Sequence, residues 1–306
     1  MTVESGRRRS TGIIGLYLAP AVILYAALFA YPALNALRIC LYKWTGFNRA
    51  NAEFVGFANF TAAFNDRWVQ VAVRNNFVIA SLGGVLMFSM SLLFAVALTS
   101  GWLRAKNFYR TVVFFPYMIS GAGVGLFWVF VLNPRFGALN GILRGLGLDS
   151  LARPWLGEPK LALGSIIYVV VWWGIGFYML FLVAGIESIP IDLFDAARVD
   201  GASESQILFR ITLPLLRDFL AVAIVLWIIE ALKTFAVVLL MTGGGPANQT
   251  QVLTTYMSKM AFNVPAGSGS VFRFGYGTAI AVILFVLVFL ASLLYFRLSR
   301  REAVEF

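Results

Sequence analysis

The chain has 306 residues, of which 60% are hydrophobic and 12% are charged, with a formal net charge of +10. Soluble domains contain about 45–50% apolar and about 25% charged residues, so the composition excludes a soluble globular protein and predicts an integral membrane protein. Histidine is absent and Cys40 is the one cysteine, which excludes His/Cys zinc sites, Ser-His-Asp and Cys-His nucleophiles and a disulfide framework. The basic residues stand beside apolar stretches, which favours a membrane surface over nucleic acid as their counterpart.

Six stretches are long and apolar enough to cross the hydrocarbon core of a bilayer, which takes about 20 residues. They are residues 13–37, 77–99, 108–132, 161–186, 219–241 and 274–296. The first follows Arg7-Arg8-Arg9, but its apolar run is longer than a signal-peptide core and lacks a small-residue cleavage site. We therefore predict an uncleaved first span and an all-α integral membrane protein with six transmembrane helices.

Lysine and arginine are enriched on the cytoplasmic side of membrane helices, and they orient these spans. With both termini inside, basic residues are denser in the inside segments than in the outside ones. The tight clusters that fall inside are Arg7-Arg8-Arg9, Arg104/Lys106/Arg110 and Arg297/Arg300/Arg301. The predicted map is a cytoplasmic tail at 1–12, a six-span region at 13–297 with outer loops at 38–74 and 242–272, and a cytoplasmic tail at 298–306.

The segment 187–218, between the fourth and fifth spans, is the longest inside loop and carries helix signals. Pro190 suits the first turn of a helix, and Gly201 can end that helix in a left-handed conformation. Ser203 with Gln206 forms a capping box, which predicts a second short helix. We therefore expect two short helices joined at a glycine.

The same loop is acidic on one side and apolar on the other. Its acidic residues are Glu187, Asp192, Asp195, Asp200, Glu204 and Asp218. Apolar stripes at helical spacing are formed by Phe194 and Ala197 on the first helix and by Ile207, Leu208 and Ile211 on the second. The second helix is expected to finish near Pro214. A folded cytoplasmic hairpin indicates a functional element and not only a connection between two spans.

One motif in this loop resembles a known family. Asp195-Ala196-Ala197-Arg198-Val199-Asp200-Gly201-Ala202, followed by Ile211-Thr212-Leu213-Pro214, is similar to the EAA loop of binding-protein-dependent ABC importer permeases. That pattern is Glu-Ala-Ala, three residues, Gly, nine residues, Ile, one residue, Leu-Pro. Every spacing matches, and the one departure is Asp195 in place of Glu, which keeps the charge with a shorter reach.

Two further stretches point to the carbohydrate-uptake members of that family. The first is Asp-Gly-Ala at 200–202. The second is Met241-Thr242-Gly243-Gly244-Gly245-Pro246, followed by Thr250 and Tyr256, which resembles a loop between the last two spans of one permease type. The larger maltose permease and one of the glycerol-3-phosphate permeases are of this type.

The resemblance implies a subunit without catalysis, in a prokaryotic inner membrane. Such permeases pair with a second, similar permease as a heterodimer, bind two copies of a cytoplasmic ATPase and receive sugar from an extracytoplasmic binding protein. The sequence agrees in lacking a Gly-x-x-x-x-Gly-Lys-Ser/Thr phosphate loop. We expect no cofactor on this chain, with ATP and Mg²⁺ bound by the ATPase.

The resemblance also assigns the ATPase-docking residues. They are Asp195, Ala196, Ala197, Asp200, Gly201, Ala202, Ile211, Leu213 and Pro214. Small residues allow close backbone approach, and the carboxylates either pair with basic groups of the ATPase or cap the hairpin. Movement of the hairpins would then drive alternating access. The alternative is an amphipathic hairpin that lies on the membrane.

Glu230 and Lys233 form the one ionisable pair deep in a predicted span. A charge there costs about 2.5–3.5 kcal/mol on the insertion scale, so the pair should face the bundle interior or a wet cavity. Trp227 and Thr234 lie near the same helical face, and an aromatic ring beside hydrogen-bonding groups suits a sugar. Both interpretations stay open: a substrate path, with Trp173 as a further aromatic candidate, or a structural ion pair with the tryptophans used for packing.

The outer segment from Cys40 to Arg74 is too aromatic for disorder and too polar to span, so we expect a small packed element there. Two rival functions remain. An ion-coupled secondary transporter of a small polar solute would want several mid-membrane carboxylates, and Glu230 alone is available. An intramembrane enzyme would want a polar catalytic cluster, which the absence of histidine disfavours. The sequence leaves the substrate open among neutral sugars, sugar acids, polyols and glycerol 3-phosphate.

Overall fold

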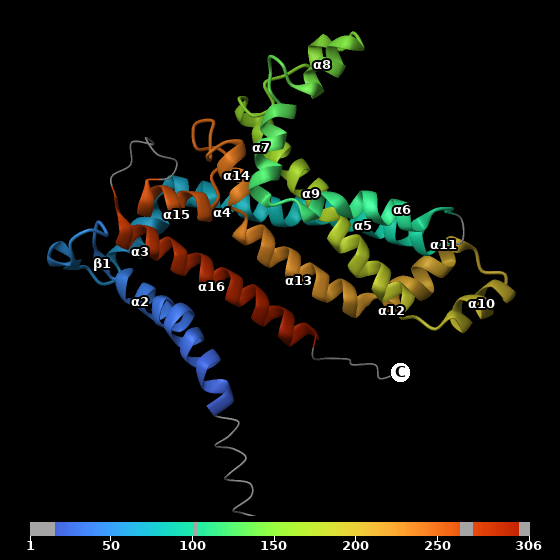
Figure 1. Cartoon of the computed structure of the whole chain (residues 1–306), viewed down its shortest axis with the longest axis horizontal. Helices are drawn as coiled ribbons and strands as arrows, with labels where there is room; N and C mark the ends of the chain where they lie inside the picture. The colour runs from blue at the N-terminus through green and yellow to red at the C-terminus, as the bar shows by residue number, and fades with distance from the viewer. Residues whose placement is uncertain (1–15, 101–102, 264–271, 300–306) are drawn as a thin grey trace, which may run out of the picture.

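The computed structural model describes residues 16–100, 103–263 and 272–299 (Figure 1). Predictions on the remaining residues, including Arg7-Arg8-Arg9, the pair Arg300/Arg301 and most of both tails, lie outside the described part of the chain. The described elements are η1 Ala26–Ala30, α2 Tyr31–Ile39, β1 Tyr42–Lys43, η2 Arg49–Asn51, β2 Glu53–Phe54, α3 Ala58–Asn65, α4 Arg67–Val78, η3 Ile79–Gly83, α5 Gly84–Thr99, α6 Lys106–Phe114, η4 Phe115–Met118, α7 Gly121–Val131, α8 Ala138–Gly145, η5 Asp149–Leu151, α9 Pro159–Glu187, α10 Ile191–Val199, α11 Glu204–Ile207, η6 Leu208–Thr212, α12 Leu213–Leu215, α13 Arg217–Lys233, α14 Ala236–Met241, α15 Leu253–Phe262 and α16 Phe274–Ser299.

Four of the predicted spans are long apolar helices. They are Leu16–Ile39, Arg67–Thr99, Pro159–Glu187 and Phe274–Leu293. The second begins ten residues before its apolar run, because the Asp66 carboxylate accepts a hydrogen bond from the backbone N–H of Trp68 and caps α4. The first turns of α4 carry polar residues, which hydropathy does not register as membrane helix. The described residues therefore form a multi-pass helical membrane protein.

The third and fifth spans are interrupted, so the prediction of continuous helices at 108–132 and 219–241 is wrong. The third consists of α6 with η4, then α7, and the two parts are bent by 97°. Ser120 interrupts it because its hydroxyl caps α7 by accepting from the N–H of Gly123. The fifth stops at Lys233 and resumes as α14 after Thr234 and Phe235. Hydropathy detects neither break because it averages over a window in which most residues are apolar, in spite of Ser120 at the first break and Lys233 at the second.

Helix α9 is the centre of the bundle, with two thirds of its most apolar stretch buried. Its neighbours include α5, α6, α13 and the η4 turn. Gly176 permits the closest crossing, because a Cβ at that position would fall 2.5 Å from the Cα of Phe114. The buried core around α9 includes Ile166, Val169 and Met87, all fully shielded from solvent.

The first long helix stands apart from this bundle (Figure 1). None of its apolar window is buried, and many of its large side chains are exposed, among them Leu16 at 75% and Tyr17 at 82%. Near Ile39 it contacts α16. So large an apolar surface requires lipid or another protein chain around it.

A small packed element follows the first helix, as predicted for the aromatic segment. Strands β1 and β2 pair antiparallel with Tyr42 opposite Phe54, and α3 follows them. The Asn59 side chain donates hydrogen bonds to the carbonyl oxygens of Cys40 and Tyr42 and fixes α3 against the hairpin of strands. This element lies at one end of the bundle, and α10 and α11 lie at the other (Figure 1).

The loop between α9 and α13 folds as two short helices, which confirms the local prediction. Helix α10 follows Pro190, and Gly201 adopts φ +78° at the junction. The Ser203 side chain accepts from the N–H of Gln206, and the Gln206 side chain accepts from the N–H of Ser203, so the capping box is present. Helix continues through η6 and α12 to Leu215, so Pro214 lies within the last turn.

Candidate functional site

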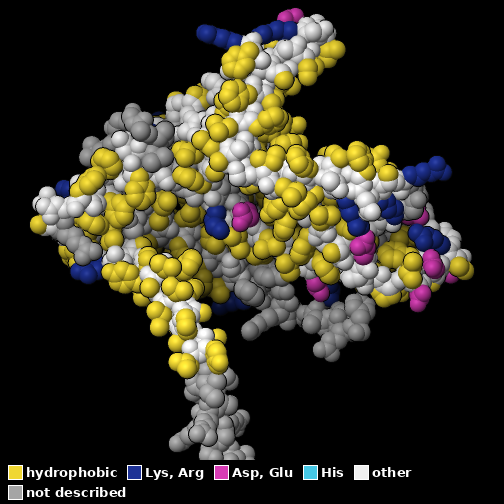
Figure 2. Space-filling model, in the orientation of Figure 1, with side chains coloured by type: hydrophobic (Ala, Val, Ile, Leu, Met, Phe, Trp, Pro, Cys, Tyr) yellow, Lys and Arg dark blue, Asp and Glu magenta, His cyan; other side chains and the backbone are white. Residues whose placement is uncertain are grey.

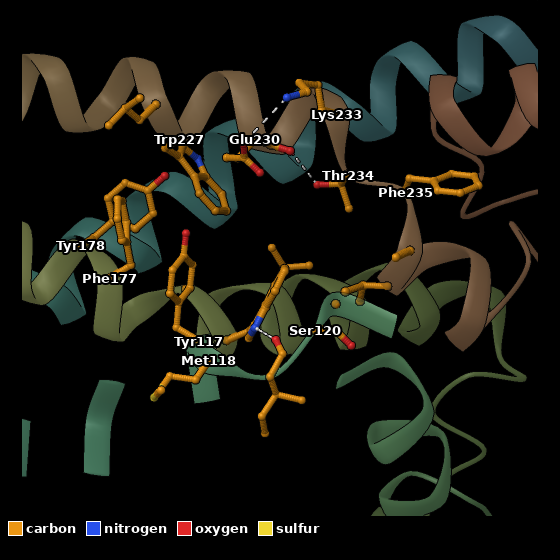
Figure 3. A pocket seen from close by; sticks show the side chains of 18 residues that line it. Tyr117, Met118, Ser120, Phe177, Tyr178, Trp227, Glu230, Lys233, Thr234 and Phe235 are labelled. Carbon is orange, nitrogen blue, oxygen red and sulfur yellow. Dashed lines mark hydrogen bonds and ion pairs between the residues drawn. The ribbon is translucent and has the colours of Figure 1, made fainter. Parts of the chain in front are cut away.

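The two interrupted spans meet α9 at a cavity of about 660 Å³ (Figure 3). The lining comes from the junction of η4 and α7, from one face of α9, and from α13, the Thr234–Phe235 break and α14. Gly121, the first residue of α7, and Lys233, the last residue of α13, both line it. A helix N-terminus carries partial positive charge and a C-terminus partial negative charge, so the cavity is flanked by backbone dipoles of opposite sign.

Glu230 and Lys233 supply the charges of this cavity. The Lys233 ammonium lies 4.0 Å from the Glu230 carboxylate, and the two side chains are 57% and 68% exposed respectively. Thr234 donates its hydroxyl to the Glu230 carbonyl oxygen at 3.0 Å, and this bond closes the last turn of α13. Exposed ion pairs are worth about 0–1 kcal/mol, so the pair is available to a ligand rather than locked in packing.

An aromatic wall faces these groups (Figure 3). The rings of Tyr117 and Phe177 stack with centroids 4.9 Å apart, and the Trp173 ring lies 6.0 Å from that of Tyr117. The Trp173 indole donates to the carbonyl oxygen of Ile119, which holds its ring beside the break in the third span. Of the two predicted tryptophans, Trp173 therefore belongs to this wall.

The other predicted tryptophan, Trp227, is buried at 4% exposure. Its indole donates to the carbonyl oxygen of Ala80 at 2.8 Å. The ring packs against Gly83 and Gly84, where a Cβ would lie within 3 Å of it. Trp227 therefore joins α13 to η3 and α5 and lines the cavity with part of its ring, while its polar N–H is taken up by a backbone carbonyl.

The sequence interpretation missed Tyr117, Ser120 and Phe177. They lie on the third and fourth spans, which hydropathy treats as uniform apolar segments. A signal was present: Pro116 near the middle of the third span, followed by Ser120 before a glycine, is the pattern of a helix stop and a new N-cap. The pattern would have located the break and the residues beside it.

Asn76 supports the end of α13 from a neighbouring helix. It is 1% exposed on α4. Its side-chain amide donates to the carbonyl oxygens of Ala231 and Leu232 at 3.1 and 3.2 Å, and its side-chain oxygen accepts from the N–H of Leu253 at 2.9 Å. One side chain thus bonds two carbonyl oxygens at the interruption, of which that of Ala231 also accepts from the Thr234 amide, and the first amide of α15.

Asn75 does the same for the glycine-rich loop that precedes α15. It is fully buried and donates to the carbonyl oxygens of Gln249 and Gln251 at 2.7 and 2.8 Å. Thr254 donates its hydroxyl to the carbonyl oxygen of Thr234. Backbone groups at membrane depth need such internal partners, so the break in the fifth span is a built feature of the fold.

A carboxylate ties three helices together at the end of the bundle that carries the strands. Asp66 accepts hydrogen bonds from the hydroxyls of Tyr256 and Tyr276, each at 2.7 Å, besides the amide of Trp68. Partial burial by itself would raise the pKa of the Asp66 carboxyl, but these hydrogen bonds outweigh it and hold the pKa below its ordinary value. The carboxylate therefore joins α4, α15 and α16.

The hairpin of α10 and α11 presents a mixed acidic and apolar outer surface (Figure 2). Of the predicted docking residues, Asp195, Ala196, Asp200, Gly201 and Pro214 are exposed, and Ala197, Ala202, Ile211 and Leu213 are half-buried. Apolar Val199 and Phe209 are 87% and 66% exposed. Arg198 lies 3.3 Å from the Asp195 carboxylate and 3.8 Å from that of Glu204, which links the two helices.

The inner side of the hairpin faces the bundle across a second cavity, of about 440 Å³, beside the ends of α5 and α9. Phe194 and Ile207 from the predicted apolar stripes line it. At the same end, the Arg110 guanidinium bonds the Glu187 carboxylate at 2.5 Å and ties α6 to the last turn of α9. The hairpin is thus continuous with the bundle but not packed solidly on it.

Known proteins resemble this chain along most of its length. It is 32% identical over 292 residues to the probable ABC transporter permease protein YurN of Bacillus subtilis, covering 94% of this chain and 97% of the relative. It is 33% identical over 294 residues to the diacetylchitobiose uptake system permease protein NgcF of Streptomyces coelicolor, covering 93% and 81%. A solved bacterial ABC transporter that imports the acidic polysaccharide alginate contains a chain with the same fold, with a TM-score of 0.82, 23% identity and coverage of 99% and 100%.

Residues 88–304 match the family model of the binding-protein-dependent transport system inner membrane component, which covers more than half of the chain. Members of this family are permeases, so the match favours an importer permease over an ion-coupled carrier. This protein belongs to the binding-protein-dependent transport system inner membrane component family.

Proposed function

We propose that this chain is one of two permease subunits of an ATP-driven, binding-protein-dependent importer of a sugar. The similarity to a diacetylchitobiose permease supports the substrate class. Its expected partners are a second permease in a heterodimer, two copies of a cytoplasmic ATPase and an extracytoplasmic sugar-binding protein. ATP and Mg²⁺ would be bound by the ATPase, and this chain would contribute half of the translocation path.

The observation that carries this proposal is the hairpin of α10 and α11. Its positive-φ turn at Gly201 and its capping box at Ser203 give a rigid projection that exposes Asp195, Asp200 and Val199 together. Such a surface fits a groove on another protein better than a lipid headgroup layer, because the carboxylates would be repelled by anionic lipids. Displacement of the hairpin by the ATPase would switch the permease pair between inward-open and outward-open states.

The cavity at the two interrupted spans is the proposed translocation path. The cavity is lined by rings, charges and a hydroxyl, from Trp173, Trp227, Glu230, Lys233 and Thr234. The indole N–H of Trp227 also bonds Ala80 and braces α13. Interrupted helices at membrane depth that line a cavity are typical of transport sites. A sugar would stack a C–H face on the rings and bond its hydroxyls to the polar groups.

The proposed topology counts both interrupted spans as crossings, which gives six, with the termini and the 187–218 loop cytoplasmic. The placement of the strand element and the hairpin at opposite ends of the bundle supports it (Figure 1). Segments 38–74 and 242–272 would then face outward. Reaction of single introduced cysteines with an impermeant maleimide in intact cells tests it: Glu53→Cys should react and Asp192→Cys should not.

The proposed coupling is tested with Asp195→Lys. Charge reversal in the exposed hairpin should abolish copurification of the ATPase and ATP-dependent uptake, while the chain still reaches the membrane. Glu53→Lys is the matched control, since it reverses an exposed carboxylate at the other end of the bundle, and it should preserve both. Intact uptake and ATPase assembly in Asp195→Lys and in Gly201→Asp would contradict the proposal.

A further inference from the structure

The charge content of the central cavity bears on which sugars can enter it. Among the described residues that line the cavity, Glu230 and Lys233 are the ones with a carboxylate or a cationic side chain. They carry one charge of each sign, so the lining is neutral overall. The other polar side chains near the break, such as Ser120 and Thr234, are uncharged hydroxyls.

The Lys233 ammonium of this pair cannot bind an anionic ligand independently of Glu230. Its neighbour at 4.0 Å is the Glu230 carboxylate, one helical turn back on the same face of α13. A carboxylate or phosphate placed against Lys233 would also lie beside Glu230, and two like charges a few ångströms apart repel strongly in a poorly hydrated site. The geometry therefore disfavours an anionic ligand without excluding a polar one.

The helix ends do not change this balance. The α7 N-terminus would favour an anion, but its Gly123 amide already bonds the Ser120 hydroxyl. The α13 C-terminus contributes partial negative charge on the opposite side, beside Lys233. The two ends oppose each other across the cavity, so their effects on a charged ligand partly offset each other.

Uncharged hydroxyls suit the same lining well. The exposed Glu230 carboxylate can accept from two neighbouring hydroxyls, and Lys233 can donate to a ring or glycosidic oxygen. Across from them, Tyr117, Trp173 and Phe177 offer ring faces for the C–H face of a pyranose (Figure 3). A neutral sugar therefore satisfies both sides of the cavity without an unpaired charge.

We propose that this cavity selects uncharged sugars over carboxylated or phosphorylated ones, and that Glu230 is the residue that sets this selection. The inference rests on the proposed function, because it assumes that the cavity is on the sugar path. Charge selection by the permease would act after the binding protein and independently of it.

The test is isothermal titration calorimetry on the purified complex of both permeases and the ATPase, without binding protein, in detergent. The probes are matched pairs in which the C6 hydroxymethyl group of a pyranose is replaced by a carboxylate: glucose with glucuronate, galactose with galacturonate, and mannose with mannuronate. In the unmodified complex the tightest neutral probe should bind at least tenfold more tightly than its acid. Glu230→Gln should reduce that ratio at least tenfold, because Lys233 then stands unpaired.

Glu53→Gln is the control, since it removes a carboxylate outside the cavity, and it should leave the ratio unchanged. Equal affinity for both members of a pair, tighter binding of the acid, an unaltered ratio in Glu230→Gln, or no binding of any probe would each overturn the inference. The proposed function would be contradicted by a different result, namely that the unmodified protein shows no ATP-dependent sugar uptake or does not copurify with an ATPase. A complex that imports a sugar acid would refute the charge selection alone.

Discussion

The break in the fifth span depends on one asparagine, and Asn76→Leu tests that dependence. The substitution keeps a side chain of similar size on α4 but removes all three hydrogen bonds to Ala231, Leu232 and Leu253. The Leu232 carbonyl oxygen and the Leu253 amide would then lose the partner that Asn76 gives them, and the Ala231 carbonyl oxygen would keep only its bond from the Thr234 amide, at 3.4 Å. Hydrogen bonds inside membrane proteins contribute about 0.6 kcal/mol on average and up to about 1.7 kcal/mol each, so the loss should be about 2–5 kcal/mol.

Asn75→Leu is the matched control. The neighbouring asparagine is equally buried and also donates two hydrogen bonds to backbone carbonyls, but both lie in the glycine-rich loop and neither lies in α13. Both variants should lower the free energy of unfolding, measured by urea titration in detergent micelles. Asn76→Leu alone should also shift the turn that carries Glu230 and Lys233.

The distinguishing assay is ATP-dependent sugar uptake by the full importer in liposomes. Asn76→Leu should raise the sugar concentration for half-maximal uptake at least tenfold, about 1.4 kcal/mol, with ATPase assembly unchanged. Asn75→Leu should leave that concentration within twofold. If the two variants lose stability equally and neither alters the sugar response, the asparagine stabilises the fold without positioning the cavity, and the reasoning fails.

Three further predictions follow from the contacts. The pKa of Asp66 is depressed in the folded chain, so the ionised carboxylate stabilises the fold at any pH above the ordinary carboxyl pKa near 4. This stabilisation is lost as the pH falls through the folded pKa. Asp66→Asn should therefore lower the free energy of unfolding at pH 7 and flatten the acid limb when the unfolding midpoint is measured against pH. Gly176→Ala should destabilise the fold by about 1–3 kcal/mol through overpacking, whereas Gly164→Ala on the same helix, with open space around the new Cβ, should cost less than about 0.5 kcal/mol in the same melting assay. Gly201→Val should strain the φ +78° turn by about 1–2 kcal/mol, visible as faster hydrogen exchange in α10; unchanged exchange would show that the turn adapts.

The elements predicted correctly from the sequence are those determined by local physics. Four apolar stretches are long enough to be membrane helices, and they are helical here. The capping box at Ser203 and the left-handed turn at Gly201 depend on residues within three positions of each other, so spacing alone indicates them. The hairpin motif that indicates the family is also a local spacing, and the family that it indicates is the one that residues 88–304 match.

The parts that the sequence did not predict depend on distant partners. Nothing near Lys233 marks a helix end; the break is stabilised by Asn76, which lies 155 positions earlier than Ala231. The place of Trp227 on the helical face indicates a stacking residue, but its indole donates to the carbonyl oxygen of Ala80 in the π-helical turn η3. Periodicity predicts which residues share a face, and only the packing of other helices decides what that face meets.

The chain path connects the hairpin to the cavity through continuous helix. Helix α9 places Trp173 and Phe177 on one wall of the cavity and ends at Glu187, just before the hairpin. Helix α13 starts at Arg217, just after the hairpin, and ends at Lys233 on the other wall. At 1.5 Å per residue, the 17 residues of α13 span about 25 Å. A displacement of the hairpin would therefore move both walls at once, and the cavity behind the hairpin gives it room. The interrupted spans make this movement consequential: α14 is joined to α13 through the non-helical residues Thr234 and Phe235, and η4 packs against α9, so the angle at each break can change while each helix stays rigid.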